Sequence, residues 1–242
     1  ISDCIVLSSI DVERDGKRVL SGLDLRVDPG EWLLLCGPSG AGKSSLLRLL
    51  AGLDEPVQGS MSRLGVQIRP GSDLPDRLDG RIVLLTQNPE HHFIASTVAE
   101  DIAWGLLRRG MEESEALSRS RGLAKSLGIE HLLERPCHQL SFGEQRRVAL
   151  AGLLVLEPAV MLLDEPTSGL DPVAANDLIN LVQQSVQETG AACIWATHDL
   201  HSVPPQVERV VLLRDGKVVF DGSSTEGLSN PWLFRAGLSV EQ

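Results

Sequence analysis

The sequence predicts an α/β fold with a mainly parallel sheet, an antiparallel β subdomain near the N-terminus and an inserted helical subdomain. Three observations lead to this prediction. Short strands that alternate apolar and polar residues open the chain, and continuous apolar strands then alternate with helices. Between residues 97 and 155 the apolar spacing is mostly helical. Continuous apolar strands are buried on both faces, so their alternation with helices indicates a parallel sheet covered by helices.

The antiparallel strands are predicted from alternation and from turn residues. Residues 4–7 and 23–27 form the opening strands, and Asp15-Gly16 and Pro29-Gly30 are typical turn dipeptides. A further hairpin is predicted over residues 210–220, because Asp215-Gly216 lies between two apolar runs.

The remaining elements follow in chain order. Buried strands are predicted at 32–36, 81–85, 160–163 and 192–196. Helices are expected at 44–51 and 174–188, and within 97–155 with breaks at 110–111, 128 and 136. Residues 60–80 are expected to be loop with edge strands. We therefore expect a single domain over 1–242, with a core of 1–87 and 156–222, a helical subdomain of about 88–155 and a short tail of 223–242.

The composition excludes several classes of protein. The 242 residues include 22 Lys and Arg against 33 Asp and Glu, a formal charge of −11. This acidic balance argues against a dedicated nucleic-acid binder, so nucleic acid is not an expected partner. No apolar run approaches the roughly 20 residues of a membrane-spanning helix. The four cysteines lie far apart, without the spacing of a metal site, and are expected to be reduced thiols.

A glycine-rich segment between the strand at 32–36 and the helix at 44–51 fits the pattern G-x-x-x-x-G-K-[ST]. Its residues are Gly37, Pro38, Ser39, Gly40, Ala41, Gly42, Lys43 and Ser44, followed by Ser45. Glycines let the backbone N–H groups approach phosphate closely, while the lysine reaches the β- and γ-phosphates and the serine hydroxyl ligates Mg²⁺. The alternative is a plain glycine-rich turn, but the position between strand and helix favours a P-loop that binds phosphate groups.

Two carboxylates end the strand at 160–163. If this strand is parallel to the one before Gly37, Asp164 lies at the same sheet edge as Lys43 and suits the Mg²⁺ shell. Glu165 suits the general base that polarises the attacking water. Adjacent acids at a strand end are often only a solvated turn, and the phosphate-binding loop is what favours the catalytic interpretation.

Further motifs resemble those of ABC-transporter ATPases, in the same order along the chain. Leu140-Ser141-Phe142-Gly143-Glu144 resembles the signature motif, which usually reads Leu-Ser-Gly-Gly-Gln. Ser168-Gly169-Leu170-Asp171 is similar to the D-loop. Gln87 matches the Q-loop glutamine, and His198 matches the switch histidine. Together with the P-loop and the two carboxylates, these motifs cover nearly the whole chain and imply a P-loop NTPase core.

The resemblance implies a role for each motif. Gln87 would sense the γ-phosphate and Mg²⁺, and His198 would contact the γ-phosphate and the attacking water. Ser141 and Gly143 would contact ATP bound to a second ATPase subunit, identical or paralogous, with Asp171 at the dimer seam. Without the ordered set, His198 would be an ordinary histidine at a strand end, and Ser141 with Gly143 an ordinary helix start.

A narrower resemblance lies in residues 86–105. Gln-Asn-Pro followed by Thr-Val-Ala-Glu-Asp-Ile-Ala-Trp-Gly resembles the ATPases of energy-coupling-factor importers, the cobalt, nickel and vitamin group. This implies a peripheral subunit on the cytoplasmic face of the cell membrane that drives solute import through separate membrane subunits. Those subunits would dock near Phe93 and Ile94, two apolar residues in a polar loop. Alternatively, both side chains turn inward and pack in the helical lobe.

One position departs from the family pattern. The superfamily usually stacks adenine on an aromatic residue upstream of the P-loop, and the matching residue here is Arg14. A guanidinium plane can stack on a base, so Arg14 and the nearby Val19 are the expected adenine contacts, although Arg14 equally fits a solvated loop.

The alternative function is a soluble ABC ATPase in DNA repair or translation. The long coiled-coil heptads and tandem ATPase units of such proteins are missing from this sequence.

Overall fold

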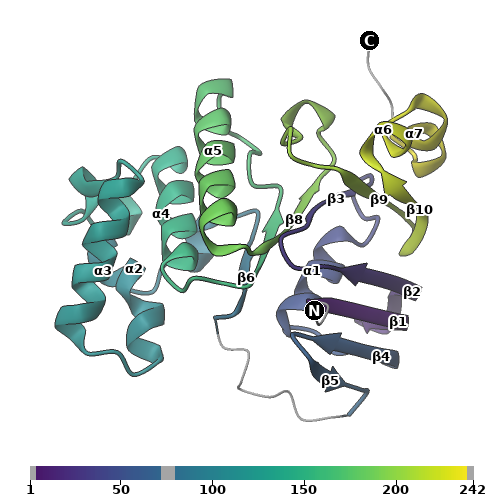
Figure 1. Ribbon diagram of the computed structural model, residues 1–242, viewed down its shortest axis with the longest axis horizontal. Coiled ribbons are helices and arrows are strands. Elements are labelled where there is room, and N and C mark those ends of the chain that lie inside the picture. Colours follow the sequence, from purple (N-terminus) through teal and green to yellow (C-terminus); the bar gives the residue numbers. More distant parts are fainter. Residues whose placement is uncertain (1–3, 72–79, 239–242) are drawn as a thin grey trace.

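The computed structural model describes residues 4–71 and 80–238 and contains a six-stranded sheet at its centre (Figure 1). The strand order is β10-β9-β3-β8-β7-β6. The bounds are β3 Trp32–Cys36, β6 Ile82–Leu85, β7 Val160–Asp164, β8 Ala192–Thr197, β9 Arg209–Arg214 and β10 Lys217–Ser223. All neighbouring strands pair in parallel except β9 and β10, which form an antiparallel hairpin. The predicted mainly parallel sheet is therefore confirmed.

A second, antiparallel sheet has the order β2-β1-β4-β5. Its strands are β1 Ile5–Arg14, β2 Lys17–Val27, β4 Gln58–Arg63 and β5 Val66–Ile68. β1 and β2 are longer than the short strands predicted, because irregular pairing lets the hairpin bend and continue. β4 and β5 fall in and beside the segment expected to be loop with edge strands, of which residues 72–79 lie outside the described residues.

Helices cover both faces of the six-stranded sheet. α1 (Lys43–Ala51) lies between the two sheets, and α5 (Pro172–Thr189) packs on the opposite face (Figure 1). Successive strand residues point to opposite faces, so Leu33 and Leu35 join the core around α1, whereas Leu34 joins the core under α5. Both faces are thus apolar, which explains the uninterrupted apolar runs in the sequence.

The inserted helices form a lobe with its own core at one side of the molecule (Figure 1). They are α2 (Val98–Arg108), α3 (Glu113–Ser126) and α4 (Phe142–Leu154). Capping boxes begin α2, at Thr97 and Glu100, and α4, at Ser141 and Glu144. All three helices lie within the segment predicted to be the helical subdomain, whose boundaries of 88 and 155 remain a prediction.

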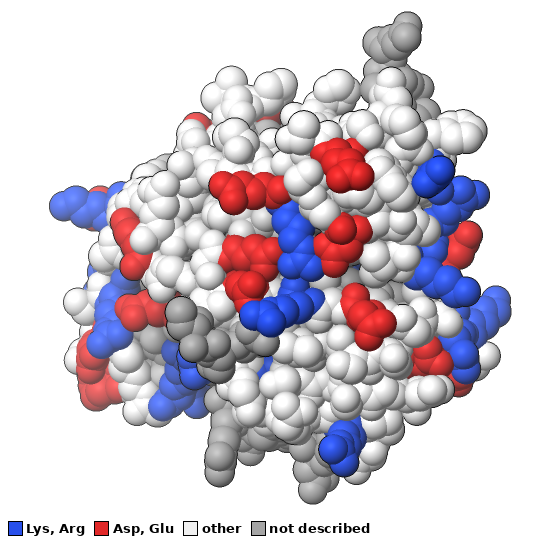
Figure 2. Space-filling view, turned by 45° about the vertical axis from the view of Figure 1, so that its right-hand side comes forward, with Lys and Arg blue, Asp and Glu red and all other residues white. Residues whose placement is uncertain are grey.

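The remaining elements are short. They are the 3₁₀ turns η2 (Pro89–His92), η3 (Glu130–Leu132), η4 (Cys137–Gln139) and η5 (Leu200–Ser202) and the helices α6 (Ser224–Gly227) and α7 (Asn230–Ala236). Within the described ranges, none of the helices combines the length and the apolar character needed to cross a bilayer. On the face in Figure 2, acidic and basic side chains are interleaved. Arg209, for example, forms ion pairs with both Asp221 and Glu31.

The turn between β9 and β10 joins three parts of the fold. Gly216 donates its N–H to Ala41 O of the glycine-rich loop at 3.0 Å and accepts from Ser21 N of β2 at 2.9 Å. Its φ is 73°, and a Cβ atom there would lie 2.4 Å from Val19 O. Gly216 is therefore required both by its left-handed backbone and by close packing.

We expect Gly216→Ala to destabilise the fold more than Gly16→Ala. Both glycines follow an aspartate in a hairpin turn and have a left-handed φ, but a Cβ at Gly16 would meet nothing within 4 Å. Gly16→Ala therefore costs only backbone strain, about 1–2 kcal/mol, while Gly216→Ala adds about 1–3 kcal/mol of overpacking. Thermal unfolding of both variants measures the difference, and equal melting temperatures would contradict it.

Candidate active site

The parallel register brings three distant segments to one edge of the sheet. β3 pairs with β8 so that Cys36 lies opposite Thr197, and β8 pairs with β7 so that Ala196 lies opposite Asp164. The glycine-rich loop, the two carboxylates and the histidine after β8 therefore meet at the carboxyl ends of adjacent strands. This is the juxtaposition expected from the sequence.

The glycine-rich loop holds Lys43 in a buried position. The Lys43 ammonium donates to Gly37 O at 2.7 Å and to Pro38 O at 3.3 Å, and its side chain is 7% exposed. Gly42 precedes α1 with a φ of 107° and offers no side chain to cap the helix. The first N–H groups of α1 and the lysine charge are thus directed to one place, an arrangement suited to an anion.

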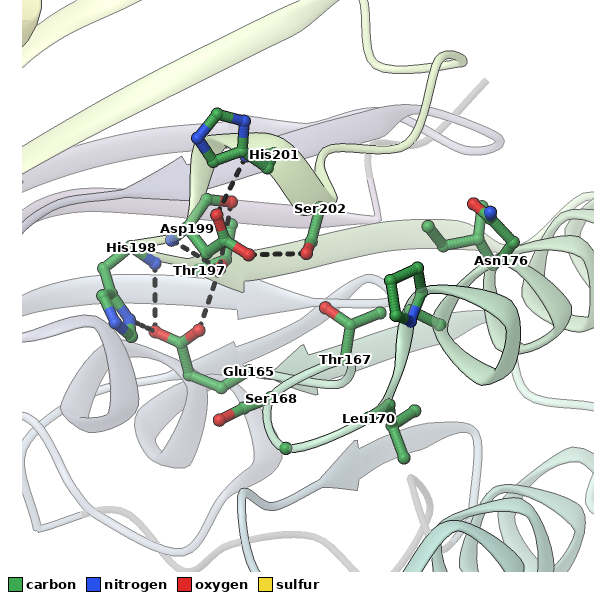
Figure 3. A pocket seen from close by; sticks show the side chains of 14 residues that line it. Glu165, Thr167, Ser168, Leu170, Asn176, Thr197, His198, Asp199, His201 and Ser202 are labelled. Atoms are coloured by element: carbon green, nitrogen blue, oxygen red, sulfur yellow. Dashed lines mark hydrogen bonds and ion pairs between the residues drawn. The ribbon is translucent and has the colours of Figure 1, made fainter. Parts of the chain in front are cut away.

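Glu165 is held by β8 and the residue that follows it (Figure 3). One carboxylate oxygen accepts from Thr197 Oγ1 at 2.8 Å, and the other accepts from His198 N at 3.0 Å and contacts His198 Nδ1 at 2.6 Å. A carboxylate only accepts, so His198 carries its proton on Nδ1. Glu165 and His198, which lie 33 residues apart in the chain, therefore form one unit.

Buried side chains of opposite charge lie beside the Glu165–His198 unit. Lys43 Nζ lies 3.8 Å from Glu165 Oε1, and both side chains are less than 10% exposed. Burial raises the pKa of the neighbouring Asp164 carboxyl, while a hydrogen bond with Ser44 acts in the opposite direction. The Ser44 hydroxyl and the Asp164 carboxylate thus lie together at the start of α1, forming an oxygen donor set of the kind Mg²⁺ prefers.

Arg146 is a residue of the site that the sequence analysis did not single out. It lies on α4, is 1% exposed, and donates to Glu165 O at 2.7 Å and to Gln87 O at 2.6 Å. The signal in the sequence was an arginine in the otherwise apolar repeat of a helix. Its neighbour Arg147 is also an arginine, and the structure shows that Arg147 is less buried. Periodicity alone does not distinguish these two, because both follow the same motif.

The signature residues start α4 and contact the D-loop of the same chain. Ser141 accepts from Glu144 N, and Glu144 accepts from Ser141 N at 2.7 Å. Phe142 lies against Gly169, and a Cβ at Gly143 would lie 3.7 Å from Leu170. Three further motif residues also have contacts within the chain. Leu140 is buried in the lobe, Ser168 N donates to Glu165 O at 3.1 Å, and Asp171 caps α5.

The remaining predicted site residues are Gln87, Arg14 and Val19, and they lie beside the P-loop and the catalytic candidates or at the surface. Gln87 follows β6 with an exposed side chain, and its backbone is held by Arg146. Arg14 ends β1 opposite Lys17 and is exposed, whereas Val19 O lies 3.1 Å from the place of a Cβ at Gly42. Val19 thus adjoins the P-loop, and the adenine contacts remain predictions.

A pocket of about 580 Å³ opens beside Glu165 and His198 (Figure 3). Thr167 and the D-loop residues Ser168 and Leu170 line one side, and Asp199 with Ser202 lines the other. The catalytic candidates therefore face a solvent-accessible hollow and not a closed core.

Fold and site together define a P-loop nucleoside triphosphatase with an inserted helical lobe. A family model described as ABC transporter matches residues 20–168. The chain belongs to the ABC transporter family, in which it is an ATPase.

Similar proteins indicate the subgroup within the ABC transporter family to which the chain belongs. The chain is 35% identical over 251 residues to the energy-coupling factor transporter ATP-binding protein EcfA1 of Halalkalibacterium halodurans, with 98% of this chain and 89% of that protein covered. The corresponding EcfA of Methanocaldococcus jannaschii is 37% identical over 216 residues, with 89% and 77% covered. CbiO1 of Clostridium perfringens, part of the ABC transporter complex CbiONQ, superposes with a TM-score of 0.83 at 31% identity, covering 97% of this chain and 94% of CbiO1. The chain therefore belongs to the energy-coupling-factor ATPase group, as the sequence indicated.

We expect Glu165→Gln to retain ATP binding and to lose hydrolysis. The amide keeps an oxygen for Thr197 but cannot accept a proton, so the rate should fall by about 10²–10⁴-fold, or about 2.7–5.5 kcal/mol in the barrier. Glu157→Gln is the control, since Glu157 also has a left-handed φ but is exposed. Phosphate release under saturating ATP measures both, and undiminished turnover in Glu165→Gln would place the base elsewhere.

Proposed function

We propose that this chain is the peripheral ATP-hydrolysing subunit of an energy-coupling-factor type importer of cobalt, nickel or a vitamin. It would dimerise on ATP and act on separate membrane subunits at the cytoplasmic face of the membrane. The single observation that carries the catalytic part is the Lys43–Glu165–His198 cluster at the carboxyl edge of the sheet. The transport part rests on the relatives, which are named as transporter subunits and do not favour the DNA-repair or translation alternative.

The residues of the cluster suit in-line attack of water on the γ-phosphate of ATP. Lys43 exchanges its carbonyl partners for phosphate oxygens, since charged acceptors are the stronger ones. Glu165 takes the proton of the attacking water, and His198 orients the carboxylate through Nδ1 while its second ring nitrogen stays available to the phosphate. Mg²⁺, when bound by Ser44, Asp164 and Gln87, would neutralise charge on the β- and γ-phosphates.

A second ATPase subunit would complete the site. Ser141 begins α4 on the lobe, and the N-terminus of α4 carries a partial positive charge that favours phosphate. Within one chain this turn contacts the D-loop. A solved relative supports the arrangement: a dimeric ATP-binding cassette bound to ADP and Pi superposes with a TM-score of 0.80 at 26% identity, covering 90% of this chain and 98% of that one. The partner would be an identical or a paralogous chain.

The membrane subunits would dock beside η2. A pocket of about 530 Å³ there is lined by Phe93, Pro136, His138 and Gln145, among others. Phe93 is half-buried and packs against both the sheet core and the lobe core, whereas Ile94 is 63% exposed. Phe93 therefore fits the inward alternative and Ile94 the outward one. Ile94 is the residue that would contact a membrane subunit.

We expect Ser141→Arg to prevent ATP-dependent dimerisation. A bulky side chain at this turn would enter the phosphate site of the partner, while the chain's own P-loop is unchanged. Size exclusion with ATP, in a Glu165→Gln background that retains the nucleotide, measures the dimer. Ser223→Arg is the control, because Ser223 also caps a helix but lies opposite Arg209, at the other end of β9 from the P-loop. If Ser141→Arg still forms dimers with ATP, the prediction is wrong and Ser141 only caps the helix.

We expect Ile94→Ser to uncouple transport while the ATPase rate of the isolated chain and its melting temperature stay unchanged. An exposed side chain contributes little to folding, but its burial against a partner is worth about 1.5–3 kcal/mol. Leu53→Ser, which alters a 56% exposed residue after α1, is the control. Solute uptake by vesicles that contain the complete transporter measures the effect. Normal uptake with Ile94→Ser would remove Ile94 from the docking surface.

A further inference from the structure

Arg146 joins three motifs that are far apart in the sequence. Its two terminal nitrogens donate to Glu165 O and Gln87 O, 19 and 59 residues away, at 2.7 and 2.6 Å. Its guanidinium also lies 5.0 Å from the ring centre of Phe142, whose Cε1 would lie 3.1 Å from a Cβ atom placed at Gly169. A planar guanidinium with several fixed donors can hold two carbonyl groups at once, whereas a lysine ammonium is a single point donor.

The Glu165 carbonyl is a sensitive place for such a contact. Glu165 has a φ of 48°, a left-handed conformation that is strained for a non-glycine residue. Its carbonyl also accepts from Ser168 N, and its own N–H donates to Ala196 O at 2.9 Å. Strained backbone persists only where neighbouring groups hold it, so removal of the arginine contact should release the turn that aims the carboxylate.

The charge of Arg146 is buried, and in the described part of the chain the acceptors of its two terminal nitrogens are carbonyl groups and not carboxylates. Burial lowers the pKa of Arg146, while the nearby Glu165 charge favours its protonated form. Its Nε atom has no hydrogen-bond partner among the described residues. An arginine used only for packing would be replaced by an apolar residue at no such desolvation cost, so the buried charge indicates a positioning role.

We propose that Arg146 is a positioning residue that sets Glu165 and Gln87 relative to each other and to the start of α4. Because Arg146 belongs to the lobe and both carbonyls belong to loops at the sheet edge, any shift of α4 changes the support of the general base. Hydrolysis is then favoured in the lobe position seen here and reduced when the lobe turns away. The inference rests on the proposed role of Glu165 as base.

The test compares Arg146→Lys with Arg147→Lys in the full chain. Arg147 is the adjacent arginine on α4, and the contacts to Glu165 and Gln87 come from Arg146. Amide hydrogen exchange is followed in peptides that cover residues 84–90 and 163–170, and steady-state ATP hydrolysis is measured on the same samples. We expect Arg146→Lys to accelerate exchange in both peptides and to lower kcat about tenfold with an unchanged KM for ATP, a change of about 1.4 kcal/mol in the barrier. Arg147→Lys should change neither.

A purely structural role gives a different result. Arg146→Lys would then lower the melting temperature and raise exchange throughout α4, with the two loops and kcat per folded molecule unaffected, and the proposal would be wrong. Arg146→Gln, which keeps a donor without the charge, is the second variant. If both variants fail to fold, Arg146 supports the whole fold and not the base in particular. The exchange measurement does not depend on import, so a failure of the transport proposal is recognised separately.

Discussion

The parallel pairing of β3, β8 and β7 is the constraint on which the site depends. It places the ends of three strands side by side, although Lys43 lies more than a hundred residues before Glu165, and His198 lies 33 residues after it. A lysine and a glutamate that are both almost fully buried stabilise each other only in this register. A slip of one residue would turn every strand side chain to the other face and separate them.

Glu165 shows how several separate contacts combine to fix one side chain and its backbone. Its carboxylate is fixed by Thr197 and His198, and its carbonyl by Arg146 and Ser168. The left-handed backbone at this residue is thus supported at both ends, which is the pre-organisation that the proposed general base would need. These contacts come from the sheet, the D-loop and the lobe, so the position of Glu165 depends on all three.

The helical lobe carries the signature motif, which distinguishes this family among proteins with a P-loop core. The lobe has its own apolar centre and begins α4 with the signature turn, but it reaches the catalytic edge through the buried guanidinium of Arg146. The membership in the energy-coupling-factor ATPase group follows from relatives that match along nearly the whole chain. On our proposals, movement of this lobe would change the support of the general base, which is a physical basis for coupling hydrolysis to an attached partner.

The sequence by itself determined the fold class, the order of the elements and most of the nucleotide motifs. Apolar periodicity and glycine-rich turns are local, so the strand at 32–36, the P-loop and the break at 110–111 could be read directly. Tertiary structure alone decided which residues share a partner. Arg146 was missed because nothing local separates it from Arg147, and Phe93 and Ile94 could not be divided between core and surface. Burial and hydrogen-bond partners depend on packing between segments distant in the chain, which periodicity along one segment does not encode.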